Sequence, residues 1–207
     1  MGLISNGTTM FDAGSMSAGF GGSMVFIKKL TASASGTLTF HHGVSSVILD
    51  STYKEYVFIF TNIHPATDGQ HLQFQGNVAG ASGFNENMSA IHWRTVNNEA
   101  GGDNYVHVHN DPGSFVQSNE TAFQPIATYL GADTDQSTHG FLYLFNPSNT
   151  TFVTQFHSRF SISNSNNYIQ DNHVSGHFHV AAAIDEIQFK MTSGNIDSGQ
   201  ICLYGIA

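Results

Sequence analysis

The chain has 207 residues and a formal net charge of −9, and only 10% of its residues are charged. Six basic residues make no positive patch for phosphate groups, which excludes nucleic-acid binding and disfavours binding to anionic lipid. The single cysteine, Cys202, excludes an internal disulfide framework, and we interpret it as a small buried apolar residue. A chain of this length is expected to form one domain. No apolar run reaches membrane-spanning length and no signal peptide is visible, so we expect no membrane partner.

The N-terminal segment, residues 1–23, is rich in glycine and has no periodicity. Composition alone favours a disordered tail. However, the segment also carries apolar side chains that a free tail seldom exposes to water. The ones expected to anchor it are Met10, Phe11, Met16 and Phe20. We therefore interpret 1–23 as an extended N-terminal arm that becomes ordered on a neighbouring subunit, ahead of a domain formed by 24–207.

From Met24 onward, short apolar segments alternate with turns rich in Gly, Asn, Ser and Pro, and several show the two-residue period of half-buried strands. The expected strands are 25–32, 37–42, 56–63, 72–78, 88–96, 105–110, 122–130, 141–145, 152–162, 173–181, 186–191 and 201–206. The first two and the last two are expected to form hairpins across short turns. No segment has long helical periodicity and no repeat has a fixed period. We predict an all-β, antiparallel, jelly-roll-like β-sandwich.

Two of the expected strands are apolar on both faces. In 141–145 and 201–206, apolar side chains stand at successive positions instead of at every second one. One sandwich has difficulty covering so much apolar surface, and closed symmetry buries the same patch on every copy. We therefore predict that the chain binds copies of itself, as a homotrimer or a higher closed ring.

Twelve histidines are present, and two pairs follow a His-x-His pattern in expected strands. They are His107 with His109 and His177 with His179, and His173 is in phase with the second pair. Side chains at i and i+2 share a strand face about 7 Å apart, so two imidazoles can reach one transition-metal ion, within a subunit or on a symmetry axis. The alternative is an exposed polar face on which His replaces charge. This alternative is favoured because no Asp or Glu lies at a recognised ligand spacing, so no resident cofactor is expected.

The sequence has no grouping of residues that is typical of catalysis. It has no Gly-x-Ser-x-Gly elbow, its acidic residues lie mainly in expected loops, and no phosphate-binding loop precedes a helix. We therefore expect that the protein is not an enzyme, with a His-metal enzyme as a minor alternative. Trp93, beside Arg94, lies near long loops, where exposed aromatic rings can stack on sugars. A core tryptophan is the commoner explanation.

Three segments carry a resemblance to a known group of proteins. They are Tyr56-Val-Phe-Ile-Phe-Thr-Asn-Ile-His-Pro-Ala-Thr-Asp-Gly69, then Gly140-Phe-Leu-Tyr-Leu-Phe-Asn-Pro-Ser-Asn-Thr-Thr151, and an ending in which Phe189-Lys-Met-Thr-Ser-Gly-Asn-Ile196 precedes Leu203-Tyr-Gly-Ile206. In this order they resemble the signatures of small virion structural proteins from marine and cyanobacterial tailed phages.

This resemblance implies a non-enzymatic bacteriophage virion structural protein, either a capsid decoration or a tail-fibre or attachment subunit. Such a protein is made in the cytoplasm of the host bacterium, resides in the virion and contacts other virion proteins. The alternative function is a carbohydrate- or receptor-binding adhesin, which would contact a host surface glycan through the loops near Trp93 and Arg94.

Overall fold

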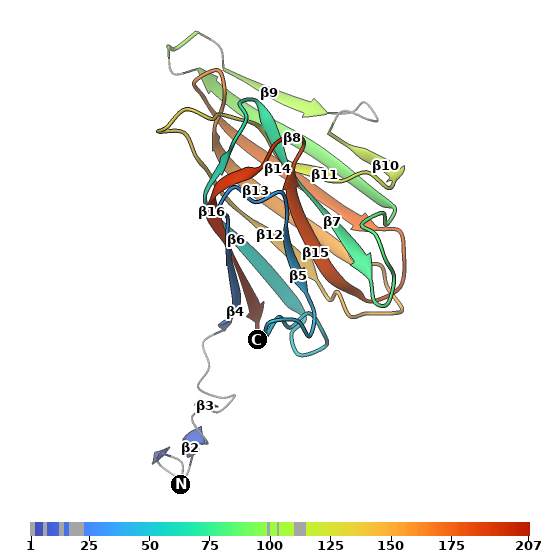
Figure 1. Ribbon diagram of the computed structural model, residues 1–207. Coiled ribbons are helices and arrows are strands. Elements are labelled where there is room, and N and C mark those ends of the chain that lie inside the picture. Colours follow the sequence, from blue (N-terminus) through green and yellow to red (C-terminus); the bar gives the residue numbers. More distant parts are fainter. Residues whose placement is uncertain are drawn as a thin grey trace.

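The computed structural model describes residues 3–5, 8–12, 15–16, 23–98, 100–102, 104–109 and 115–207, with side chains from Ser23 onward. These residues form strands, turns and loops (Figure 1), and no helix among them could cross a membrane. Near the N-terminus, three short strands pair into a small antiparallel sheet. They are β1 (Leu3–Ser5), β2 (Thr8–Asp12) and β3 (Ser15–Met16). Phe20 lies outside the described residues, as do the side chains of Met10, Phe11 and Met16, so their role as anchors stays a prediction.

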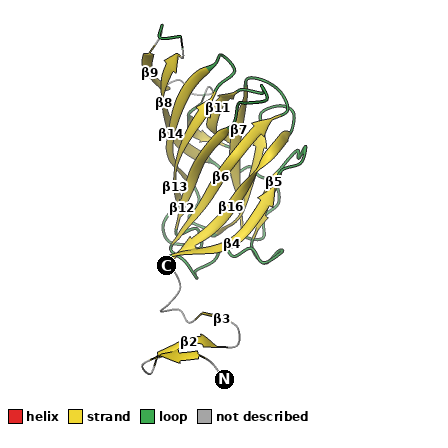
Figure 2. Cartoon of the chain, turned by 90° about the vertical axis from the view of Figure 1, so that its left-hand side faces the viewer, coloured by secondary structure: helices red, strands yellow, loops and turns green. Residues whose placement is uncertain are grey.

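The larger of two packed sheets has nine strands in the order β10-β8-β14-β13-β12-β6-β16-β4, with β9 also paired to β8. They are β4 (Met24–Thr31), β6 (Glu55–Pro65), β8 (Met88–Asn98), β9 (Asn104–His109), β10 (Gln117–Glu120), β12 (Thr138–Phe145), β13 (Gln155–Ser163), β14 (Tyr168–Phe178) and β16 (Ile196–Ile206). Figure 2 shows most of them side by side, from β9 at one end to β4 at the other. All the pairings are antiparallel, which confirms the predicted all-β class.

The smaller sheet has four antiparallel strands in the order β11-β7-β15-β5. They are β5 (Leu38–His41), β7 (Gln70–Val78), β11 (Gln124–Leu130) and β15 (Ile184–Met191). This sheet lies against one face of the larger sheet, called here the inner face (Figure 1). The opposite face of the larger sheet, the outer face, is covered by no other sheet in the described part of the chain.

Phenylalanine rings hold the two sheets together. Phe189 on β15 lies edge-on to Phe58 and Phe60 of β6, with ring centroids 5.3 Å and 5.0 Å away. Phe40 on β5 contacts both Phe58, at 5.2 Å, and Phe189, at 6.2 Å. All four rings are at most 1% exposed. Edge-to-face contacts of this kind add about 0.5–1.5 kcal/mol per pair to the free energy of burial, so these rings are a main source of stability.

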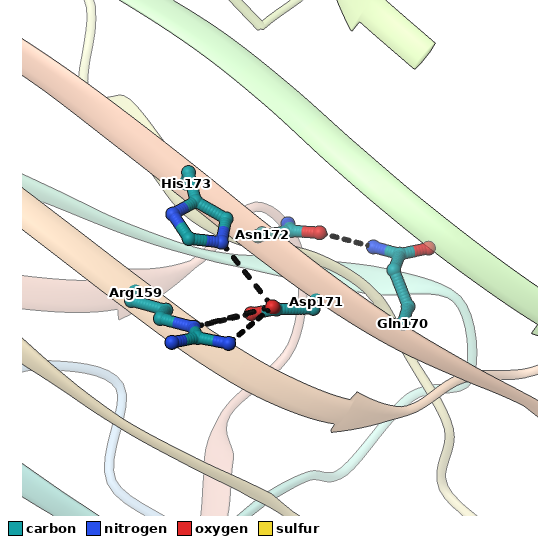
Figure 3. A network of polar contacts seen from close by, with 5 residues as sticks. All are labelled: Arg159, Gln170, Asp171, Asn172 and His173. Atoms are coloured by element: carbon teal, nitrogen blue, oxygen red, sulfur yellow. Dashed lines mark hydrogen bonds and ion pairs between the residues drawn. The ribbon is translucent and has the colours of Figure 1, made fainter. Parts of the chain in front are cut away.

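A buried polar network also bridges the sheets. Gln170 Nε2 on β14 donates to the hydroxyl oxygen of Thr128 on β11 at 2.8 Å and to its carbonyl oxygen at 2.9 Å. Asn172 Nδ2 donates to the same hydroxyl oxygen at 2.9 Å, and Gln170 donates to the amide oxygen of Asn172 at 2.6 Å (Figure 3). All three side chains are 0% exposed. Because buried amides are costly without partners, this network fixes β14 against β11.

The two predicted hairpins are wrong. β4 and β5 follow one another in the chain, as do β15 and β16, but each pair is divided between the two sheets. The turn after β4 lies against the start of β16, because the Ala34 amide donates to the carbonyl oxygen of Asp197 and the Ser35 amide donates to that of Ile196. A short turn between two alternating strands fits a hairpin and a crossing between sheets equally well. The sequence pattern therefore does not distinguish them.

The outer face carries many apolar side chains. In β12 the inward Leu142 and Leu144 are buried while Tyr143 is turned outward, and in β16 Leu203 is buried while Tyr204 is turned outward. The exposed large apolar side chains on this face are Met24, Phe26, Ile91, Trp93, Val106, Val108, Phe145 and Ile169. The predicted two-faced apolar strands are therefore confirmed, and their outer sides add apolar side chains to a face that also carries the charged Arg159 and Asp171.

Candidate functional site

The outer face is organised around a stacked pair of rings. Trp93 on β8 lies opposite His173 on β14 in the strand register, and both side chains point outward. Their rings are nearly parallel, with centroids 3.8 Å apart and an angle of 7° between the planes. Trp93 is 37% exposed, so the commoner expectation of a core tryptophan is wrong. The strand surface, and not a loop, presents this indole to solvent.

A chain of polar contacts holds His173 in place. His173 Nε2 lies 3.2 Å from Asp171 Oδ2, and Arg159 on β13 donates to the two oxygens of Asp171 from Nε at 3.1 Å and from Nη2 at 2.9 Å (Figure 3). Hydrogen bonding to Asp171 raises the pKa of Arg159 above its usual value. The forked guanidinium contact orients the carboxylate, and the carboxylate orients the imidazole that packs on Trp93.

A hollow of about 920 Å³ lies beside the indole. Trp93, Ile91 and Val108 line it from β8 and β9, and Phe145 closes it from β12. The strands between them contribute polar side chains. These are Gln155 and His157 of β13 and Ser175 and His177 of β14. None of the described residues that line the hollow is Asp, Glu, Lys or Arg, so the site combines apolar side chains with uncharged polar groups and imidazoles.

The imidazoles in the hollow favour their neutral form. Partial burial, with a smaller effect from His173, lowers the pKa of His157, and its Nδ1 lies 3.0 Å from the Ser175 hydroxyl oxygen. Partial burial, with a smaller effect from His179, likewise lowers the pKa of His177. At neutral pH each ring therefore offers one donor nitrogen and one acceptor nitrogen.

The hollow reaches inward where β9 and β10 meet along β8. β9 pairs with His92 to Asn97 and β10 pairs with Met88 to Ala90, so the two strands adjoin at Ile91. Two buried polar side chains line this end of the hollow, His92 at 1% exposure and Gln117 at 5%. Neither ring nitrogen of His92 has a hydrogen-bond partner among the described residues, and neither does Gln117 Oε1. Both side chains belong to the inner face, with His92 opposite His109 and Gln117 opposite the buried Ala90, so these atoms are enclosed by the two sheets.

Aromatic and cationic groups surround His92 on the inner face. Its ring stacks on His109 at 4.7 Å and lies edge-on to Phe115 at 5.6 Å. Burial, with smaller effects from His109, Arg94, His107 and His71, lowers the pKa of His92 to about 3. Burial and Arg94 lower the pKa of His71 to about 4. His92 is therefore neutral in the folded protein at neutral pH.

The predicted metal-ligand residues lie on both faces of the larger sheet. His107 and His109 pair with Arg94 and His92 on the inner face, whereas His173 and His177 point outward. His179 follows the end of β14, 4.8 Å from the ring of His177, and its Nε2 lies 2.7 Å from the Ser89 hydroxyl oxygen. Within the described residues, no group of three or more His, Cys, Asp or Glu side chains could hold a metal ion. A metal shared between copies stays a prediction.

The structure separates the two predicted glycan contacts. Trp93 is on the outer face, whereas Arg94 is 9% exposed on the inner face, where its guanidinium carbon lies 4.7 Å from the centroid of Tyr129. Arg94 Nη1 also donates to Gln170 Oε1 at 3.2 Å. Successive side chains of a strand point to opposite faces, so these two residues do not contact one ligand together.

Several residues of the hollow were not singled out in the sequence. Gln117 lies on β10, which was not among the expected strands, and its polar sequence, Gln-Ser-Asn-Glu, gives no strand signal. The strand expected to begin at residue 152 begins at Gln155, leaving Phe152 72% exposed. Alternation along β13 turns His157 to the face opposite that of the buried Phe156. This alternation is the sequence signal that could have placed His157 on the outer face.

Comparison with protein-family profiles, with curated proteins and with solved structures gives no significant match.

Proposed function

We propose that this chain is a non-enzymatic structural subunit of a bacteriophage virion, either a capsid decoration or a tail-fibre or attachment subunit. The order of its three sequence segments supports the virion, because together they resemble small structural proteins of tailed phages. The assembly itself is supported by one observation, an apolar edge of the larger sheet. A low charge content of 10% is compatible with a subunit that is packed against neighbours.

This edge is strand β4. It pairs with β16 on one side only, and no described strand pairs with its other side. Phe26 is 56% exposed and lies edge-on to Tyr204 of β16 at 5.6 Å, and Met24 is 41% exposed. An unpaired, apolar edge strand is a template for another chain unless charge or Pro protects it. Lys28 and Lys29 protect the second half of β4, so the apolar template is its first half, 24–27. Copies joined at this edge in a closed ring would bury the same surface on each subunit.

The proposal is tested by incorporating two variants into phage particles. Phe26→Ser removes an apolar ring from the β4 edge, whereas Val44→Ser changes a residue that is 51% exposed in the turn after β5. We expect Phe26→Ser to be incorporated several-fold less than the unchanged chain, and Val44→Ser to be incorporated equally. Circular dichroism establishes that both variants fold. Equal incorporation of folded Phe26→Ser contradicts assembly through this edge.

A further inference from the structure

We propose that the hollow beside Trp93 binds an uncharged saccharide, with the exposed indole as a stacking platform for a sugar ring. This site lies toward the β8–β9 end of the outer face, away from the β4 edge, so the inference goes beyond assembly. It would give a virion subunit a means of contacting a polysaccharide on a bacterial surface.

The exposed indole of Trp93 provides a platform for a sugar ring. A pyranose ring presents a face of C–H bonds, which packs on the electron-rich face of an aromatic ring. Trp93 remains 37% exposed at the hollow, although His173 covers it at 3.8 Å. Because Asp171 and Arg159 hold His173, the indole is fixed before the ligand arrives. A fixed ring loses little conformational freedom on binding, and this is the condition under which a weak stacking contact contributes most.

Hydrogen-bonding groups surround this platform. Gln155, Ser175 and the two neutral imidazoles of His157 and His177 line the floor of the hollow, where they can donate to and accept from sugar hydroxyl groups. Such sites combine an apolar surface with a few polar groups that fix orientation. His157 and Ser175 already contact each other at 3.0 Å, but a purely apolar partner would leave Gln155 and His177 without hydrogen bonds, which is costly on desolvation.

The charge of the hollow and of the whole chain favours an uncharged ligand. None of the described residues lining the hollow carries a carboxylate, an ammonium or a guanidinium group. The chain as a whole has a formal charge of −9, which repels acidic polymers. A nucleotide could also stack on an indole, but its phosphate would find no cation in this site. Charge and hydrogen-bonding capacity together select a neutral sugar.

The test uses the full chain, an array of neutral and acidic bacterial glycans, and titration of the strongest neutral ligand. Trp93 is the only tryptophan in the chain, so its fluorescence reports directly on the hollow. We expect neutral glycans to bind with a Kd on the order of 0.1–1 mM and to change the Trp93 emission. Acidic glycans of similar length should bind more weakly.

Four variants decide whether the hollow is responsible. Trp93→Ala, followed by calorimetry, should weaken binding about tenfold or more, and Trp93→Phe should restore part of it. Gln155→Ala changes an exposed side chain and should weaken binding without affecting folding. Phe152→Ala alters an aromatic ring outside the hollow, 72% exposed, and should leave binding unchanged.

The outcomes separate this proposal from the proposed assembly. Phe26→Ser should lose assembly and keep glycan binding, because Phe26 does not line the hollow. The proposal is overturned if no neutral glycan binds at concentrations up to about 5 mM, or if acidic glycans bind best. It is also overturned if binding survives both Trp93→Ala and Gln155→Ala, since the ligand would then lie elsewhere.

Discussion

The imidazole of His173 lies flat on the indole of Trp93, with ring centroids 3.8 Å apart and planes inclined by 7°. The two residues belong to neighbouring strands, β14 and β8, that are paired along their whole length. This contact gives the outer face an aromatic surface, and Asp171 and Arg159 on the same face hold its imidazole by hydrogen bonds. The surface can therefore recognise a ligand without first becoming ordered.

Removing His173 should loosen the indole. In His173→Ala, we expect the near-ultraviolet circular dichroism of Trp93 to weaken and its fluorescence emission to move to longer wavelength, because the ring gains mobility and contact with water. His139→Ala is the matched control, since His139 is exposed on β12. Unchanged Trp93 spectra in a folded His173→Ala protein would show that the stacking does not fix the ring.

Phe189 should be among the most sensitive positions for stability. Its ring contacts aromatic rings from both sheets and is 0% exposed. We expect Phe189→Ala to reduce the free energy of unfolding by about 3–5 kcal/mol, through lost burial and a residual cavity. Phe152→Ala, at a ring that is 72% exposed, should change it by no more than about 0.5 kcal/mol. Urea denaturation measures both, and similar losses would contradict this description of the core.

The Thr128 hydroxyl should matter more than its size suggests. Thr128→Val keeps the volume but removes the acceptor for the buried amides of Gln170 and Asn172. We expect a loss of about 1–3 kcal/mol in the free energy of unfolding, because each buried donor that loses a partner remains desolvated. Thr192→Val, just after β15, is the control, because the two hydrogen bonds of that hydroxyl, from the His71 amide and to Gln70 Oε1, are exposed to water. A smaller loss for Thr128→Val than for Thr192→Val would refute a role for the network.

Stability should fall on acidification through His92. Its pKa is lowered to about 3 in the folded protein, compared with about 6.5 when unfolded, so below pH 6.5 the unfolded chain binds a proton that the folded chain does not. Stability is therefore lost progressively from pH 6.5 to pH 3. At pH 4.5 we expect a loss on the order of 2 kcal/mol from this residue.

Urea denaturation at pH 7 and pH 4.5 tests this dependence. The variant His92→Phe retains an aromatic ring without the titrating nitrogens, so its stability should fall less between the two pH values. His71, with a pKa of about 4, contributes in the same direction and remains in the variant. An equal pH dependence in both proteins would exclude His92 as the cause.

Alternation along single strands was readable from the sequence, whereas contacts between strands were not. The pattern in β16 placed Leu203 and Tyr204 on opposite faces, and burial confirms this. The same rule separates Trp93 from Arg94, but it does not say which of them faces the core, because β8 carries apolar side chains on both faces. The pairing of Trp93 with His173 depends on β14 lying beside β8, a long-range pairing that no local pattern encodes.

The proposed virion function is tested most directly by cryo-electron microscopy of intact phage particles purified from the cells that make this chain. We predict a regular array of density on the capsid or tail into which residues 23–207 fit, with the β4 edge against a neighbouring copy and the Trp93 hollow open to solvent. The virion function would be contradicted by complete particles that lack the chain by mass spectrometry and show no density that fits this two-sheet domain.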